Sequence, residues 1–255
     1  MAFVIAFAGK GGTGKTTIAG LTIRYIIEKR GMPVLAVDAD PNNCLHEVLG
    51  VDVHSTIGDL REESLTLIRS GSERPGGMSM EQIFDYQVQQ SLVESSGFDL
   101  MVMGRPEGPG CYCAANNIIR KYTDRLSLNY PYVVIDNEAG MEHLSRRTTQ
   151  KVDLLLIISD PSVRGLHAAR RIRKLVDDLH LEVDRSEVVI NRVTGSDMPT
   201  LRKSAEENGI ALAGFIPNDS LIAHFDLTGK PVVQISAGSR SLTALFLILD
   251  SLNIP

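Results

Sequence analysis

Short runs of apolar residues, many of them β-branched, recur along the chain and predict buried strands. A strand covered on both faces of a parallel sheet reads as a continuous apolar run rather than as an alternating one. The runs are FVIAFA (3–8), VLAVD (34–38), LMVMG (100–104), YVVID (132–136), DLLLIIS (153–159) and EVVIN (187–191). ALAGFIP (211–217) is a candidate for one strand more.

Amphipathic stretches between these runs predict helices. The first ends at Lys29 and Arg30 followed by Gly31, which is a typical helix stop. Alternation of strands and helices predicts a doubly wound α/β fold, with one mostly parallel sheet flanked by helices and ligands at the carboxyl ends of the strands. The predicted helices cover about 15–30, 162–179, 198–208 and 239–252.

No repeat or domain-dividing linker interrupts this pattern, so residues 1–255 are expected to form a single domain. The most loop-like stretch, SGSERPGGMS (70–79), is expected to connect two surface helices. The composition, 43% apolar and 22% charged, is that of a folded globular protein.

Charge and the N-terminal sequence limit the function classes. The formal charge of −5 gives no global attraction to nucleic acid or to anionic lipid, so neither is an expected partner. The run MAFVIAFAG is too short for a membrane span and has no basic region before it. We therefore expect a cytoplasmic protein.

The stretch GKGGTGKTT (9–17) directly follows the first predicted strand and opens the first predicted helix. It fits the phosphate-binding loop G-x-x-x-x-G-K-[ST], in which backbone N–H groups and a helix N-terminus hold phosphates. Lys15 is expected to reach the β and γ phosphates, and Thr16 to ligate Mg²⁺. The expected nucleotide-binding residues of this loop are Gly9, Gly11, Gly12, Thr13, Gly14, Lys15, Thr16 and Thr17.

Aspartates end two of the predicted strands. Asp38 and Asp40 lie in VDADP (37–41), and Asp136 lies in YVVIDNEAG (132–140). Carboxylates at such positions can hold Mg²⁺ through its waters and can position an attacking water.

A lysine directly after the first glycine is not required by an ordinary phosphate loop. With Lys10, the sequence GKGGxGKTT resembles the deviant Walker A class of MinD, ParA and the nitrogenase iron protein. The resemblance implies an ATPase of the SIMIBI class of P-loop NTPases that binds ATP or ADP with Mg²⁺. It also implies that Lys10 acts on the nucleotide of a partner chain, so that hydrolysis depends on a nucleotide-dependent homodimer.

The same resemblance assigns the acidic residues and the base contacts. It implies that Asp40 orients the attacking water in the first switch and that Asp38 supports the metal shell. It also implies that Asp136 and Gly140 belong to the second switch. Three further residues match positions that contact adenine, namely Asn191 in EVVINRV and Pro217 and Asp219 in GFIPNDS.

Within this class, three motifs together resemble the CooC family, whose members deliver nickel during maturation of carbon monoxide dehydrogenase and whose relatives serve acetyl-CoA synthase. The motifs are DP-x-x-C-L (Asp40 to Leu45), GCYCAANN (110–117) and AGMEHL (139–144). The resemblance implies that Cys111 and Cys113 bind metal and that a client nickel enzyme is a partner.

The chemistry of the cysteine pair agrees with this implication. Neighbours at i and i+2 do not suit a disulfide, and the chain has 3 cysteines in all. Two pairs across a homodimer would supply four thiolates, which suit tetrahedral Zn²⁺ or square-planar Ni²⁺, and the sequence does not choose between these metals. Cys44 is interpreted as a packed small hydrophobe, and His46 and His143 as structural or solvated side chains.

Two alternatives stay open. One is an iron-sulfur reductase like the nitrogenase iron protein, although DNEAGMEHL (136–144) lacks a second-switch cysteine. The other is a MinD- or ParA-like positioning ATPase. Against membrane binding, LTALFLILDSLNIP (242–255) has no basic residue and reads as a buried helix. Against DNA binding, the basic residues from Arg164 to Lys174 are expected to form a solvated, paired helix face, with Asp177 and Asp178 at i+4 from Arg173 and Lys174.

Overall fold

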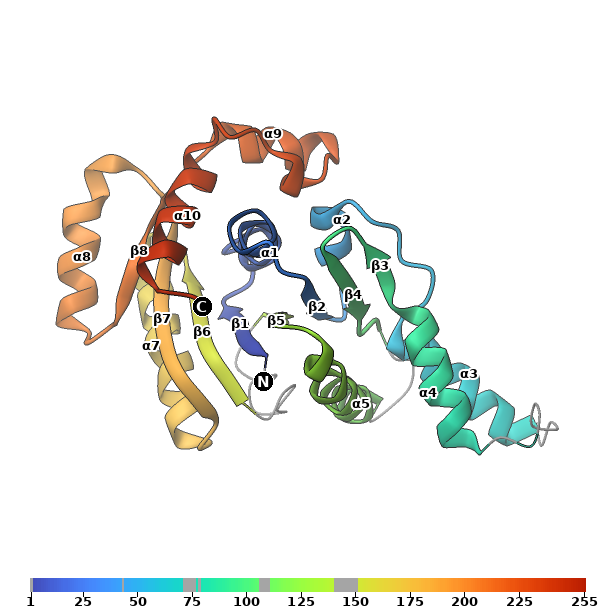
Figure 1. The fold of residues 1–255 in the computed structure, drawn as a ribbon. Helices are drawn as coiled ribbons and strands as arrows, with labels where there is room; N and C mark the ends of the chain where they lie inside the picture. The colour runs from blue at the N-terminus through green and yellow to red at the C-terminus, as the bar shows by residue number, and fades with distance from the viewer. Residues whose placement is uncertain (1, 43, 71–76, 78, 106–110, 140–150) are drawn as a thin grey trace.

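The structure is a computed structural model that describes residues 2–42, 44–70, 77, 79–105, 111–139 and 151–255. Its centre is one eight-stranded sheet with the order β3-β4-β2-β5-β1-β6-β7-β8, in which β3 is antiparallel to β4 and all other neighbours are parallel. The doubly wound α/β fold predicted from the apolar runs is therefore confirmed (Figure 1).

The strands follow the predicted runs closely. They are β1 (Phe3–Gly9), β2 (Val34–Ala39), β3 (Val93–Ser95), β4 (Phe98–Val102), β5 (Tyr132–Asn137), β6 (Lys151–Ser159), β7 (Glu182–Val193) and β8 (Leu212–Pro217). Two predictions need correction. The pattern did not include β3, and it placed its third strand at 100–104. The corresponding strand β4 pairs with β3 across a turn at Gly97 and ends before Gly104, whose backbone is left-handed.

The helices are α1 (Lys15–Arg30), α2 (Leu45–Leu49), α3 (Ile57–Ser70), α4 (Met80–Ser91), α5 (Cys111–Leu126), α7 (Val163–Asp178), α8 (Met198–Glu207), α9 (Ser220–Thr228) and α10 (Arg240–Ser251). Four helices, α1, α7, α8 and α10, lie where the pattern placed them, whereas the pattern gave no range for α2, α5 or α9. The stop after α1 is confirmed, since Gly31 adopts a left-handed conformation and its N–H donates to the carbonyl of Ile27. Helices α3 and α4 flank the predicted loop and project from the sheet (Figure 1).

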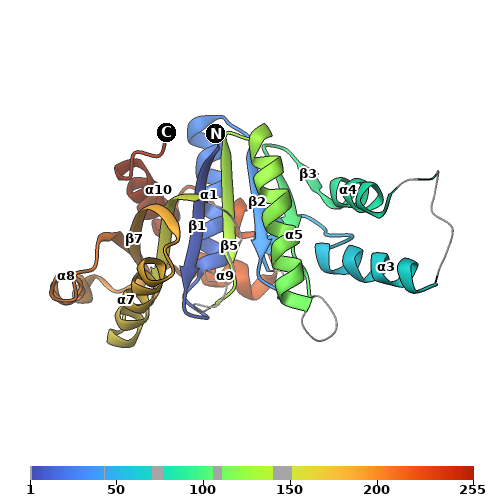
Figure 2. The same cartoon turned by 90° about the horizontal axis from the view of Figure 1, so that it is seen from below.

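Helices cover both faces of the sheet. One apolar cluster joins α1, α2 and α10 to alternate strand residues such as Ile5 and Phe7, and the other joins α5, α7 and α8 to their neighbours Val4, Ala6 and Ala8. Figure 2 shows α5 and α7 on the near face, with α1 and α10 behind the sheet. None of the helices in the described part of the chain is long and apolar enough to cross a membrane.

The central strand β1 sets the position of the site. It is buried from Val4 to Gly9 and lies between β5 and β6. The carboxyl ends of β1, β2 and β5 meet at one edge of the sheet, because all three strands run in the same direction. Glycine is required where β1 ends, since a Cβ on Gly9 would lie 2.3 Å from the carbonyl oxygen of Ile158.

Candidate nucleotide-binding site

The glycine-rich loop lies between β1 and α1, as predicted. Gly14 precedes the first turn of α1 with φ of 90°, and it has no side chain that could cap the helix. The first N–H groups of α1 are thus available to an anion. Lys15 is 7% exposed and Lys10 is exposed, so the two lysines of the loop lie in different environments.

Two buried carboxyl groups lie side by side on neighbouring strands beside this loop. Asp38 on β2 and Asp136 on β5 are register partners and are 0% and 1% exposed. Burial raises the pKa of Asp38 to about 7, with the charge of Asp136 adding to the effect. Burial likewise raises the pKa of Asp136 to about 6, although the Thr16 hydroxyl and the Lys15 ammonium favour its ionised form.

The hydrogen bonds of these carboxyl groups differ. Asp38 accepts from the backbone N–H of Asp40 at 3.1 Å and from that of Leu45 at 3.0 Å, so it holds the turn after β2. Asp136 has a buried oxygen, Oδ1, without a hydrogen-bond partner in the described residues. A buried oxygen of this kind needs a proton, a water or a cation.

These residues fit the chemistry of Mg²⁺. The ion prefers oxygen ligands and retains several waters, so a carboxylate beside a P-loop hydroxyl is a suitable donor set. The Thr16 hydroxyl and Oδ1 of Asp136 would provide it, the carboxylate directly or through a water. Asp40 lies at the rim, where its Oδ1 accepts from the backbone and side-chain N–H groups of Asn42 at 2.9 and 3.0 Å.

A cavity of about 290 Å³ lies at the start of α1, on the side of β7 and β8. Its lining includes all three residues predicted to contact the base, Asn191, Pro217 and Asp219, together with Gly14 and Thr17. The fold thus brings together positions far apart in sequence, as the hydrogen bond between Asn191 and Thr13, which are 178 positions apart, illustrates. Their contact with adenine stays a prediction.

Two of these side chains already have protein partners. Nδ2 of Asn191 donates to the carbonyl of Thr13 at 2.9 Å, which ties β7 to the glycine-rich loop. The carboxylate of Asp219 caps α9 by accepting from Leu221, and it accepts from Ser239 and from the N–H of Ser241. Burial opposes ionisation of Asp219, but these hydrogen bonds outweigh it and lower its pKa. Asp219 therefore shapes the wall of the cavity.

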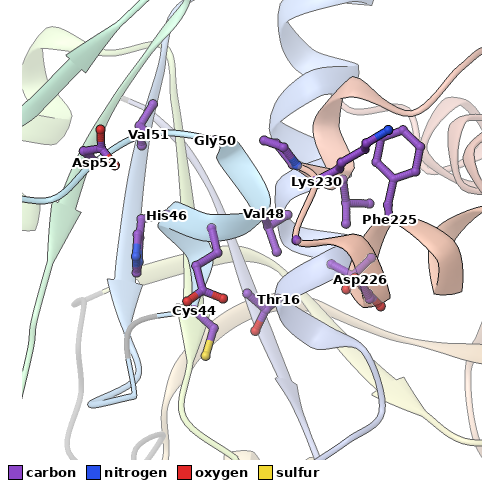
Figure 3. A pocket seen from close by; sticks show the side chains of 15 residues that line it. Thr16, Cys44, His46, Val48, Gly50, Val51, Asp52, Phe225, Asp226 and Lys230 are labelled. Carbon is purple, nitrogen blue, oxygen red and sulfur yellow. The ribbon is translucent and has the colours of Figure 1, made fainter.

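A second cavity of about 700 Å³ shares Thr17 and Asp226 with the first. Figure 3 shows His46 and Cys44 of the α2 segment on one side, Phe225, Asp226 and Lys230 on the other, and Thr16 with Val48 between them.

The interpretation of Cys44 as a packed small hydrophobe is wrong. Cys44 is exposed, because it precedes the first turn of α2 and its apolar neighbour Leu45 takes the buried position.

Several predicted residues lie partly or wholly outside the described residues. Gly140 and His143 are among them. Cys111 and Cys113 belong to α5, but their side chains are outside the described part. Within the part that is described, no group of three or more His, Cys, Asp or Glu side chains is arranged to hold a metal ion.

The charge pairing predicted for α7 is not observed. In the described residues, the five basic side chains from Arg164 to Lys174 are exposed and form no ion pair with Asp177 or Asp178, which are also exposed. Side chains at i and i+4 are close enough to pair, but two solvated charges gain little by doing so. The prediction for α10 is confirmed, because Leu242, Leu245 and Leu249 are buried.

Sequence reasoning missed two residues of the site. Asn137 is 2% exposed and its Nδ2 donates to the carbonyl of Phe7, which fixes β5 against β1 just below the loop. Arg192 contacts the loop itself, as described below. The signal for Arg192 was a basic residue directly after the strand-end asparagine, but only the tertiary structure shows where its side chain points.

A glycine-rich loop between a central strand and a helix, with buried carboxyl groups at the adjacent strand ends, defines a P-loop nucleotide hydrolase. The chain belongs to the CobQ/CobB/MinD/ParA nucleotide-binding domain family, whose model matches residues 4–232. It is therefore an ATPase of that family, and the nucleotide for this site is ATP or ADP.

Known relatives agree with this assignment. An uncharacterized ATP-binding protein of Methanocaldococcus jannaschii is 45% identical over 229 residues, which cover 90% of each chain. The carbon monoxide dehydrogenase accessory protein CooC of Rhodospirillum rubrum is 31% identical over 245 residues, 92% of this chain and 91% of the relative. A ParA family ATPase from Chlorobium tepidum has a TM-score of 0.74 at 19% identity with full coverage of both chains, a likeness that concerns the fold.

Proposed function

We propose that this protein is a homodimeric ATPase that delivers nickel during maturation of carbon monoxide dehydrogenase or acetyl-CoA synthase. The observation that carries the proposal is the 31% identity with the CooC accessory protein over 92% of this chain. The pair Cys111 and Cys113 gives that likeness a chemical basis, because a soft metal needs thiolate ligands.

Two chains would complete the metal site. One chain offers two thiolates, too few to enclose a soft metal, whereas a twofold homodimer offers four. Four thiolates accept Ni²⁺ in square-planar or Zn²⁺ in tetrahedral geometry. Nickel is the cargo in this proposal, and Zn²⁺ competes for the same ligands.

In this proposal, ATP hydrolysis at the nucleotide site drives the delivery of nickel. Lys15 would hold the β and γ phosphates, and Asp40 would orient the attacking water from the turn after β2. Mg²⁺, when bound near Thr16 and Asp136, would neutralise charge on the phosphates. Lys10 of one chain would stabilise the transferred phosphoryl group in the partner chain, so that hydrolysis requires the dimer. The exposure of Lys10 is compatible with this reach.

A direct backbone connection supports coupling between the two sites. The N–H of Met103, just after β4, donates to the carbonyl of Asp38 at 2.8 Å, and the carbonyl of Met103 accepts from Gly58 at 2.8 Å. Met103, after which the chain continues toward α5 and the cysteine pair, is therefore attached to the end of β2. A movement of Asp38 on binding Mg²⁺ and ATP would reach Met103 through this hydrogen bond.

Metal analysis tests the proposal. We would measure nickel binding by equilibrium dialysis for the wild type, for Cys111→Ser with Cys113→Ser, and for Cys44→Ser, with and without a nonhydrolysed ATP analogue. The double variant should lose stoichiometric nickel binding and keep ATP binding. Cys44→Ser is the matched control, because it removes an exposed thiol at the nucleotide edge and should bind nickel normally.

Three outcomes would contradict nickel delivery. Unchanged nickel affinity in the double variant would exclude the cysteine pair as the cargo site. A brown protein with broad visible absorbance after anaerobic purification would favour an iron-sulfur reductase. Salt-sensitive binding to nonspecific duplex DNA at physiological ionic strength would favour a ParA-like positioning ATPase, in which the exposed basic side chains of α7 would contact phosphates.

A further inference from the structure

The glycine-rich loop can bind phosphates only if its carbonyl groups point away from the ligand. A loop that turns its N–H groups inward must direct carbonyl oxygens outward, and each of these needs a donor of its own. One is satisfied within the loop, where the Thr13 hydroxyl donates to the carbonyl of Lys10 at 2.9 Å. The carbonyls of Gly12 and Thr13 depend on side chains from elsewhere.

Both donors come from two consecutive residues of β7. Nη1 of Arg192 donates to the carbonyl of Gly12 at 3.0 Å, and Nδ2 of Asn191 donates to that of Thr13 at 2.9 Å. In a regular strand, consecutive side chains point to opposite faces of the sheet. Asn191 and Arg192 can therefore both reach the glycine-rich loop only if the strand is irregular at this point.

That interruption is present at this point of β7. The register with β8 shifts between Ile190 and Val193, and Arg192 has φ of 60°. A bulge of this kind re-aims side chains and is often found next to functional sites. The N–H of Arg192, which leaves the ladder, donates instead to Oδ1 of Asn191 at 2.9 Å.

The left-handed backbone of Arg192 is unusual within this structure. The other non-glycine residues with positive φ in the described chain are His180 and Asn253, which follow the ends of α7 and α10, where left-handed residues are common. Arg192 lies inside a strand and has a long side chain, so its conformation is disfavoured. Strain of this kind persists where the surrounding structure requires it and concentrates at functional sites.

We propose that Arg192 is a positioning residue of the nucleotide site. Its guanidinium holds the Gly12 carbonyl outward and thereby keeps the loop N–H groups directed at the phosphates. Arg192 also lines the 290 Å³ cavity, so the same bulge connects the base cavity to the phosphate loop. This role belongs to the ATPase site and does not depend on nickel delivery.

The left-handed backbone makes a discriminating test available. Glycine adopts positive φ without strain, so Arg192→Gly removes the guanidinium while it relieves the backbone. We expect its melting temperature to be equal to or above that of the wild type. We expect its ADP affinity to fall about five- to tenfold, the effect of one hydrogen bond, and its adenosine affinity to stay unchanged, because adenosine has no phosphates.

Two further variants complete the experiment, with affinities measured by titration calorimetry. Arg192→Lys keeps a cationic donor and should recover part of the ADP affinity. Arg202→Ala removes an arginine that lies over the Phe215 ring and should bind ADP normally. Wild-type ADP affinity in Arg192→Gly would overturn the proposal. An equal loss of adenosine and ADP affinity would also overturn it, since that would show that Arg192 acts on binding of the base and not of the phosphates.

Discussion

Asp38 of β2 and Asp136 of β5 lie opposite each other as register partners in adjacent parallel strands, and both carboxyl groups are buried beside the glycine-rich loop. Neither has a basic side chain among its hydrogen-bond donors in the described residues. Burial and the charge of Asp136 oppose ionisation of Asp38, so a cation bound here would favour the form in which both acids are charged.

The first prediction concerns the stability of the nucleotide-free protein. Burial raises the pKa of Asp38 to about 7 and that of Asp136 to about 6, both above the value of an unfolded chain. A raised folded-state pKa stabilises the protein below the unfolded pKa, and the contribution is lost as pH rises through the folded pKa. The free energy of unfolding should therefore fall as pH rises from about 4 to about 7.

Urea denaturation in EDTA at pH 5 and pH 8 checks this dependence. Asp136→Asn removes one buried charge, so it should be more stable than the wild type at pH 8 by on the order of 1 to 2 kcal/mol and should show a weaker pH dependence. Asp52→Asn changes an exposed carboxylate and serves as the control. A wild type that gains stability from pH 5 to pH 8 would contradict the burial of these acids.

The second prediction concerns Mg²⁺. Asp136→Asn and Thr16→Ala should each reduce Mg²⁺-dependent ATP hydrolysis at least about 100-fold, because charge stabilisation at the phosphates is lost. ADP binding without Mg²⁺ should change less than about threefold, since the loop N–H groups and Lys15 remain. Steady-state hydrolysis and calorimetry measure the two effects. Equal loss of both would instead indicate a damaged loop.

The third prediction concerns Lys10. Lys10→Ala should bind ATP normally but hydrolyse it about 10³-fold more slowly, in the manner of a lost arginine finger. It should also fail to dimerise with a nonhydrolysed ATP analogue in sedimentation velocity. Lys203→Ala removes an exposed lysine of α8 that lies near Glu207 and should behave like the wild type. Normal turnover in Lys10→Ala would refute a role across the dimer.

The fourth prediction compares two glycines of the loop. Both have positive φ, 79° at Gly12 and 90° at Gly14, but a Cβ at Gly12 would meet nothing within 4 Å, whereas one at Gly14 would lie 2.6 Å from Nδ2 of Asn191. Gly14→Ala should therefore reduce ADP affinity more than tenfold relative to Gly12→Ala, which carries the backbone strain alone. Fluorescence titration with a labelled ADP measures the difference. Equal affinities would show that the Asn191 contact does not limit the loop.

Local sequence was sufficient for most of the fold. Apolar runs such as DLLLIIS (153–159) cannot be exposed on either face, so each predicts a buried strand, and Gly31 ends α1 because it adopts the left-handed conformation that stops a helix. The short strand β3 was not predictable in this way, since its three residues become a strand only by pairing with β4.

The sequence by itself determined the phosphate loop, because its chemistry depends on glycines and a lysine at fixed spacing in one segment. Only the tertiary structure decided the rest of the site. The pairing of Asp38 with Asp136 depends on strand order, since β2 and β5 are neighbours in the sheet although other elements separate them in the chain. The contact of Arg192 with Gly12 depends on a bulge in β7 and joins residues 180 positions apart. The spacing of residues along a chain determines local geometry. Contacts between distant segments depend instead on the order of the strands in the sheet and on where a strand is irregular.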